Sequence, residues 1–338
     1  MLFRIVAHRF LSATLAATLA PVVVAAPAHA LSKMASTLLC ADLPAATGTP
    51  EEAAKALIEA QAAFDDRKDA AKAEQGLLAY DKALAGKPED VATRIKAARL
   101  YYLVADGYWR LKGEAKQDQM VAGFEKGMAH AAAAIAVASP TLKKKICSGA
   151  PMAEVVAAID ERALEPTYWF ATHMGKYGLA KDLLEVLSNK DLIFAMMAKL
   201  QSLKPDYYWY APDRYLASYY TKVPFPEGDP ARSFAHFSAS IKGAPQYLAT
   251  YNLMAELYTV RAATKIDPRA AKCAMGAKKV DGAAAPKVHP CRTLFESLLR
   301  TVINAKLDAV PELVAEHAVE KRKAEALLKD VDTFFPAE

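Results

Sequence analysis

The sequence predicts an all-α protein of stacked antiparallel helix pairs, for three reasons. Alanine is abundant throughout and runs of β-branched residues are short, a composition that favours helix over strand. Apolar residues recur at helical spacing in most segments. Small and aromatic residues recur ahead of prolines at a spacing typical of tetratricopeptide repeats. The expected fold is therefore a degenerate, tetratricopeptide-like (TPR-like) solenoid of about ten to twelve helices.

Residues 1–30 are expected to be a secretory signal peptide that is cleaved off. Two arginines form a short positive region, Phe10–Ala26 is apolar, and Ala28–Ala30 provides the small residues of a cleavage site. The apolar stretch is shorter than a membrane span, which makes an uncleaved anchor the weaker alternative. We therefore expect an exported, soluble mature chain that begins at Leu31. In it, residues 31–49 form an N-terminal segment and residues 50–332 form the helical repeat domain.

The mature chain is only mildly basic. The signal peptide contains two of the 43 Lys and Arg residues and none of the 38 Asp and Glu residues, which leaves 41 basic against 38 acidic residues, a net charge of +3. Nucleic-acid-binding proteins present a concentrated basic stripe instead. No nucleic-acid partner is expected.

Four cysteines are present, and an even number suggests disulfides in an exported protein. Cys273 and Cys291 bracket a segment without helical period, so we expect a Cys-bounded insertion at about 266–291, closed by a bond between them. Cys40 and Cys147 would then pair with each other. Zinc is the alternative, but C-x2-C spacing is absent and His289 is the only nearby histidine. No metal site is expected.

Caps, prolines and repeat-like spacings place the helices along the chain. Glu51–Asp66, capped by Thr49, and Ala70–Ala85 form the first expected pair, and Arg94–Leu111 with Asp118–Ala136 forms the second. The basic run at 143–145 is expected in a solvated loop. Later helices are expected at Pro151–Ile159, Thr167–Leu179, Lys181–Leu203, Ala231–Gly243, Gln246–Tyr258, Thr293–Lys306 and from Pro311 to the tail.

The chain lacks the common catalytic motifs G-x-S-x-G, H-E-x-x-H, the P-loop and G-x-G-x-x-G. Five histidines remain after removal of the signal peptide, and no two are spaced to bind a metal from one helix. Adjacent carboxylates such as Asp160 and Glu161 point away from each other on a helix. We therefore expect a non-catalytic protein without a cofactor, although a helical scaffold can hold an active site that no motif reveals.

An aromatic cluster is the candidate binding site. Four consecutive aromatic residues at 207–210 would point in different directions on a helix, so they cannot all face one core. Either they are nevertheless core residues, or some line a cavity in which Arg214 pairs with an anionic group of a ligand. The candidate ligand-binding residues are Tyr168, Trp169, Tyr208, Trp209, Tyr210, Arg214 and Tyr215.

Five segments have a characteristic order over residues 50–330, namely Ala122–Gly127, Glu165–Phe170, Pro212–Leu216 with the following tyrosines, Gly228–Phe237 and Val319–Leu328. Together they resemble the TatT family, the TPR proteins associated with TRAP transporters. The resemblance implies a periplasmic, all-α TPR protein that forms a homotrimer and has a ligand-sized cavity. It also implies a partner, the periplasmic substrate-binding protein of a TRAP transporter, and a small organic or hydrophobic ligand. The alternative is a general periplasmic TPR scaffold for envelope protein assembly, without a transport role.

Overall fold

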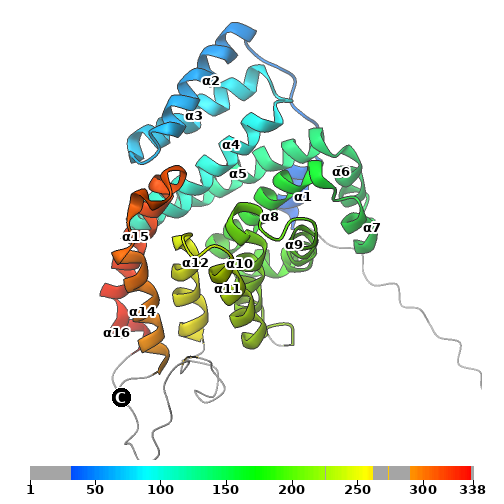
Figure 1. Ribbon diagram of the computed structural model, residues 1–338. Helices are drawn as coiled ribbons and strands as arrows, with labels where there is room; N and C mark the ends of the chain where they lie inside the picture. Colours follow the sequence, from blue (N-terminus) through cyan, green and yellow to red (C-terminus); the bar gives the residue numbers. More distant parts are fainter. Residues whose placement is uncertain (1–31, 225, 262–272, 274–289, 336–338) are drawn as a thin grey trace, which may run out of the picture.

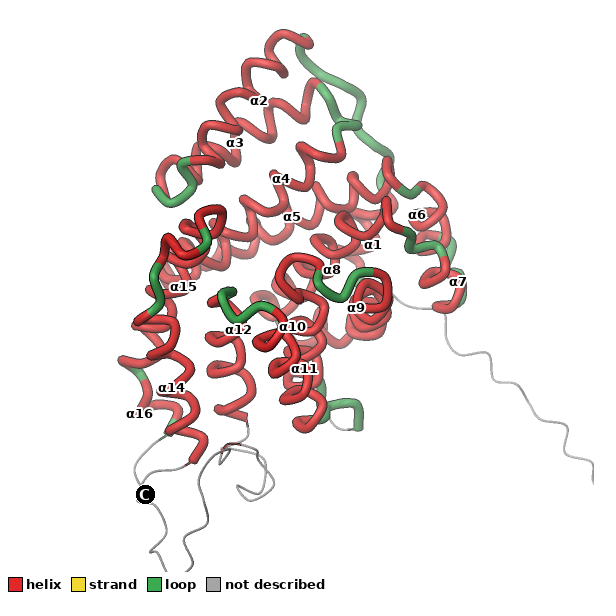
Figure 2. The backbone as a smooth tube through the Cα atoms, viewed as in Figure 1, coloured by secondary structure: helices red, strands yellow, loops and turns green. Residues whose placement is uncertain are grey.

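The computed structural model describes residues 32–224, 226–261, 273 and 290–335, and every regular element within these ranges is a helix (Figures 1 and 2). The all-α prediction is thereby confirmed. The predicted signal peptide, and the predicted insertion except for its two cysteines and residue 290, lie outside the described residues. Within those residues, no helix combines the length and the apolar character that crossing a membrane would require.

The helices agree with the predicted pairs in order and approximate bounds. The α-helices are α1 (Lys33–Cys40), α2 (Pro50–Asp65), α3 (Ala70–Gly86), α4 (Val91–Tyr102), α5 (Gln117–Ala138), α6 (Pro140–Cys147), α7 (Met152–Ala157), α8 (Glu161–Lys181), α9 (Leu183–Leu203), α10 (Tyr207–Lys222), α11 (Pro230–Gly243), α12 (Leu248–Leu253), α14 (Pro290–Asn304), α15 (Val314–Lys329) and α16 (Val331–Phe334). Two π-helical segments, η1 (Leu103–Trp109) and η3 (Met254–Thr259), continue α4 and α12. Short 3-10 helices are η2 (Arg110–Lys116), η5 (Leu307–Ala309) and η6 (Pro311–Leu313).

Side-chain caps explain where the helices begin. At the start of α2, Thr49 accepts a hydrogen bond from the backbone of Glu52, whose carboxylate accepts one from the Thr49 backbone in return. The carboxylates of Asp69, Asp90 and Asp229 accept hydrogen bonds from backbone amides in the first turns of α3, α4 and α11. Each such cap contributes about 1 kcal/mol by satisfying amide groups that have no partner inside the helix.

Two local predictions were wrong. Helix α8 begins at Glu161 rather than after Pro166, because Asp160 caps the amides of Arg162 and Ala163 and the proline is accommodated inside the helix. The basic run at 143–145 belongs to α6 rather than to a loop. Leu142 and Ile146 are buried on the inner face of this helix, which leaves the lysines on its outer face.

The helix pairs stack side by side from α2–α3 through α4–α5 and α8–α9 to α10–α11, but α15 turns back toward the first pair (Figure 1). Helix α15 packs against η1 and against the turn after α2. In that turn, Arg67 donates hydrogen bonds to the Glu316 carboxylate at 3.0 Å and to the Glu312 carbonyl at 2.6 Å. Gly107 permits the close approach, since a Cβ atom there would lie 2.8 Å from Val319. The array therefore closes on itself.

Two disulfides join the cysteine pairs expected from the sequence. Cys40 at the end of α1 is bonded to Cys147 at the end of α6, and Cys273 is bonded to Cys291 at the start of α14. The first bond joins α1 to α6, and α1 also packs against α5, where Leu39 belongs to the main hydrophobic core. The second core cluster lies among α12, η3 and α14, and both of its cysteines are buried.

Candidate functional site

A cavity of about 330 Å³ lies among the middle helices. Its walls come from α5, α8, α9 and α10, together with the two π-helical segments η1 and η3. Leu179 and Lys222 line the cavity and are exposed, so they mark where it meets the surface. Much of the lining is apolar, and its aliphatic and phenylalanine members are Met120, Phe124, Leu179, Ala180, Val186, Ile193, Ala211, Val223, Leu253 and Leu257.

Two carboxylates reach the cavity from the π-helical segments. Asp106 lies in η1 and is 4% exposed, and Glu256 lies in η3. A π-helical turn holds one more residue than a regular turn, which changes the direction of its side chains, and such turns are frequent at functional sites. In both helices, the irregular segment is the one that brings an acid to the cavity.

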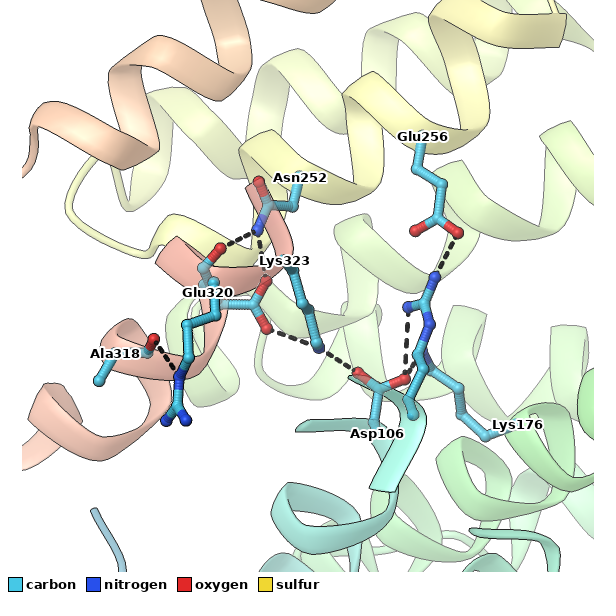
Figure 3. Close-up of polar contacts among 9 residues, drawn as sticks. Asp106, Lys176, Asn252, Glu256, Ala318, Glu320 and Lys323 are labelled. Atoms are coloured by element: carbon cyan, nitrogen blue, oxygen red, sulfur yellow. Dashed lines mark hydrogen bonds and ion pairs between the residues drawn. The ribbon is translucent and has the colours of Figure 1, made fainter. Parts of the chain in front are cut away.

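Asp106 is the centre of a buried ion-pair network (Figure 3). Its carboxylate accepts hydrogen bonds from Lys176 of α8 at 2.6 Å and from Lys323 of α15 at 2.5 Å. Arg110 lies 3.7 Å from the same carboxylate and also forms an ion pair with Glu256. Helices α8 and α15, which are distant from η1 in the sequence, thus meet at one side chain of η1.

The network continues into α12 and α15. Lys323 also donates to Glu320 at 2.9 Å, and the Asn252 amide donates to the Glu320 carboxylate at 2.7 Å and to its carbonyl at 2.8 Å (Figure 3). Burial alone would raise the pKa of the Asp106 carboxyl, but Lys176, Lys323 and Arg110 outweigh it and hold this pKa well below its usual range. Asp106 is therefore ionised at neutral pH.

Positive charge exceeds negative charge in the cavity lining, which contains five Lys and Arg side chains and two carboxylates. Lys176 and Arg110 pair with the two acids, and Lys190 pairs with Asp191 and Glu227 outside the lining. Arg214 and Lys222 are left without a carboxylate partner among the described residues. The cavity therefore has an apolar wall and two uncompensated cations, an arrangement that attracts an anion.

The aromatic run before Arg214 is not a regular helix. Tyr208, Trp209 and Tyr210 have φ angles of 45°, 55° and 56°, in the left-handed region. Each such non-glycine residue costs about 1–2 kcal/mol. Arg214 offsets this cost by donating hydrogen bonds to the carbonyls of Trp209 at 2.9 Å and Tyr208 at 3.2 Å, while Ser240 donates to the Tyr210 carbonyl at 3.2 Å. The expectation that these aromatics spread around a regular helix was wrong.

The seven candidate residues separate into three groups. Tyr168, Arg214 and Tyr215 line the 330 Å³ cavity. Trp169 and Tyr208 line a smaller chamber beside it, which Tyr168 and Arg214 also line. Trp209 and Tyr210 are lining residues of neither space. Trp209 stacks on Tyr247 at a ring distance of 5.5 Å, and Tyr210 packs against Gly243.

Tyr215 shapes the cavity wall through a close contact with α8. Its hydroxyl donates to the Ala171 carbonyl at 3.0 Å and lies only 1.8 Å from where a Cβ atom of residue 175 would be. Residue 175 is glycine, which makes this contact possible.

The ion-pair network was not predicted from the sequence, because its members lie far apart in the chain. One signal was available, because Asp106 is the only charged residue in the apolar stretch Leu103–Trp109. A lone acid in such a stretch is usually buried and paired. Its partners could not be identified from helical spacing, since Lys176 and Lys323 come from other helices.

In the ranges that the structure describes, no cluster of three or more His, Cys, Asp or Glu side chains is arranged to hold a metal ion.

The family model of the TRAP transporter T-component (TAtT) matches residues 68–267, which is more than half of the chain. The chain therefore belongs to the TRAP transporter T-component family, as the resemblance predicted. A search of curated proteins gives no significant match. Helices α14 and α15 lie beyond the matched residues.

Proposed function

We propose that this TRAP transporter component binds a small organic anion in the 330 Å³ cavity and works, without catalysis, with the periplasmic substrate-binding protein of the transporter. The cavity supports this proposal most directly. Its volume lies within the usual range for small-molecule sites, and its lining combines an apolar wall with a few polar groups. The two cations without carboxylate partners, Arg214 and Lys222, favour a negatively charged ligand.

The family supports the remaining parts of the proposal, which are export to the periplasm, assembly as a homotrimer and contact with a substrate-binding protein. Two exposed leucines add a structural argument. Leu179 lines the cavity where it meets the surface, and Leu184 lies at the start of α9, directly after the α8–α9 turn. Exposed apolar side chains beside an opening favour contact with another protein.

A cavity-filling substitution tests ligand binding. Ser218 lines the cavity and is half-buried, and its hydroxyl only bonds a carbonyl of its own helix. We expect Ser218→Phe to fill part of the cavity and to weaken the binding of aliphatic carboxylic acids at least about tenfold, a loss of roughly 1.4 kcal/mol. Isothermal titration calorimetry on the chain without residues 1–30 measures this, and native mass spectrometry detects ligand retained through purification.

Ser202→Phe is the matched control. Ser202 is an exposed serine on α9 whose hydroxyl also bonds a carbonyl of its own helix, and it is not among the lining residues. It should leave binding unchanged. Equal binding by the wild type and both variants would contradict a ligand site in this cavity.

The partner and the assembly are tested separately. We expect light scattering to give the mass of three chains, and a pull-down with the purified cognate substrate-binding protein to show a complex. Replacing Leu184 by Asp should weaken either the trimer or the complex with the substrate-binding protein. A monomer that captures no substrate-binding protein would favour the alternative, a general TPR scaffold in the cell envelope.

A further inference from the structure

A second chamber, of about 40 Å³, adjoins the main cavity. Five residues line both spaces, namely Tyr102, Asp106, Tyr168, Arg214 and Leu253. The chamber also contacts α15, which contributes His317 to its lining. Because α15 lies beyond residues 68–267, this wall is formed by a part of the chain that the family match does not cover.

Three residues that line the chamber, each from a different helix, contain buried nitrogen atoms. The Trp169 indole nitrogen, both ring nitrogens of His317 and the Arg99 Nε atom are buried and have no hydrogen-bond partner among the described residues. Trp169 is 1% exposed and His317 is 2% exposed. A buried donor without an acceptor costs about 1–3 kcal/mol, and such groups are rare in folded proteins.

The carboxylates that line the chamber do not accept hydrogen bonds from these nitrogen atoms, because each already pairs with another side chain. Glu316 accepts from Arg67 at 3.0 Å and lies 3.8 Å from the Arg99 Nη2 atom, so that only the Nε atom of Arg99 lacks an acceptor. Glu320 accepts from Lys323 at 2.9 Å, and Asp106 accepts from Lys176 and Lys323. Burial lowers the pKa of His317, so its ring is neutral near pH 7 and one of its nitrogens is a donor. The groups that lack partners are therefore chiefly donors, and they require an acceptor.

We propose that this chamber binds the carboxylate of the ligand, whose aliphatic body lies in the main cavity, so that the substrate class is an aliphatic monocarboxylate. This inference rests on the proposed function. A carboxylate supplies two oxygen atoms that accept several hydrogen bonds each, which matches the Trp169, His317 and Arg99 donors. Arg214 lines both spaces and is buried without a carboxylate partner in the described part of the chain.

The size of the chamber supports a carboxylate rather than a larger group. A space of about 40 Å³ holds about three water-sized groups, and a carboxylate has three heavy atoms. The apolar remainder of such a ligand fits the 330 Å³ of the main cavity. The ligand would then be orientated with its charged end inward, away from Lys222 at the surface.

Two ligands of equal length test the charged end on the intact protein. Octanoate and octan-1-ol share the aliphatic body and differ in the head group. By calorimetry, we expect wild-type protein to bind octanoate at least about tenfold more tightly than octan-1-ol. This comparison needs no variant and is therefore independent of any effect on folding.

Chamber variants then locate the carboxylate. Trp169→Phe and His317→Leu each remove a donor, and we expect each to lower the affinity for octanoate at least about fivefold while octan-1-ol binding changes less than about twofold. His317→Gln keeps an N–H donor and should retain most of the preference. Trp109→Phe is the matched control, because the Trp109 indole already donates to Glu74 at 2.8 Å and lines neither space.

The remaining outcomes separate the two proposals. If Lys222→Gln abolishes the preference for octanoate while the chamber variants do not, the carboxylate lies at the surface end, and the chamber proposal is overturned although the cavity proposal stands. Equal binding of octanoate and octan-1-ol overturns the chamber proposal and the preference for an anion, whereas the binding of an apolar ligand in the main cavity stands. Binding of neither ligand overturns both proposals.

Discussion

Removing the charge of Asp106 should destabilise the protein strongly. Asn is nearly the same size as Asp, so Asp106→Asn removes the charge with little change in packing. Lys176 then loses the only carboxylate with which it pairs among the described residues, and Lys323 keeps only Glu320. Breaking a buried ion pair by neutralising one partner costs about 3–5 kcal/mol, because the other charge stays buried and uncompensated.

Asp66→Asn provides a control at the same distance. Asp66 and Lys72 lie 2.5 Å apart, as do Asp106 and Lys323, but the side chains of the exposed pair are 60% and 52% exposed. Water screens this pair, so its loss should cost far less than the loss of the buried pair. The free energy of unfolding of both variants can be compared by urea denaturation at pH 7. A cost for Asp106→Asn below about 1 kcal/mol, or equal to that of the control, would refute the importance of burial.

The same cluster gives a pH dependence with a definite sign. The pKa of Asp106 is lower in the folded protein than in the unfolded chain, so the folded state binds fewer protons and acid favours unfolding. The stabilisation from Asp106 is complete above about pH 4, the ordinary value for aspartate, and is lost as the pH falls toward the folded value. Asp106→Asn should remove this part of the acid sensitivity. The double variant Asp106→Asn/Lys323→Met should recover part of the stability, because it also removes a buried cation.

Two further predictions concern His173 and the disulfides. Burial lowers the pKa of His173 to about 4, so its neutral form stabilises the fold above about pH 6.5 and this contribution falls as the pH drops toward 4. Between pH 6.5 and pH 4, we expect the free energy of unfolding to fall by about 3 kcal/mol because of His173, as measured by urea denaturation. The fall should be smaller in His173→Gln. Parallel pH profiles of the two proteins would contradict the lowered pKa of His173. Opening the Cys40–Cys147 bond should cost more than opening the Cys273–Cys291 bond, about 4.7 against about 3 kcal/mol, because the bonds close loops with separations of 107 and 18 residues. Double Cys→Ala variants test which bond contributes more to stability. Peptide mapping without reductant tests the pairing, and alkylation of any cysteine before reduction would contradict it.

Helix positions were predictable because local interactions determine them. The Thr49–Glu52 cap involves residues three positions apart, and its residue types are recognisable in the sequence. The two cysteine pairs were also predictable from a local pattern. The sequence between Cys273 and Cys291 has no helical period, which indicated a bond between these two cysteines, and Cys40 and Cys147 remained as the second pair. The error at Pro166 has the same local origin, because a proline suggests a helix start while the cap at Asp160 decides it.

The lining of the cavity could be predicted only in part, since it depends on contacts between distant residues. Tyr168, Arg214 and Tyr215 were among the candidates, but the ion-pair network was not. Lys323 and Asp106 are 217 positions apart, and Arg67 and Glu316 are 249 apart. Whether they meet depends on small rotations that accumulate from one helix pair to the next, and helical periodicity contains no information about those rotations. The left-handed turn at Tyr208–Tyr210 was also not predictable from the sequence, because local preference favours a regular helix there. Hydrogen bonds from Arg214 and Ser240 stabilise the turn. Sequence periodicity thus determined which residues form helices, while the return of α15 onto the first helix pair determined which charged groups meet around the cavity.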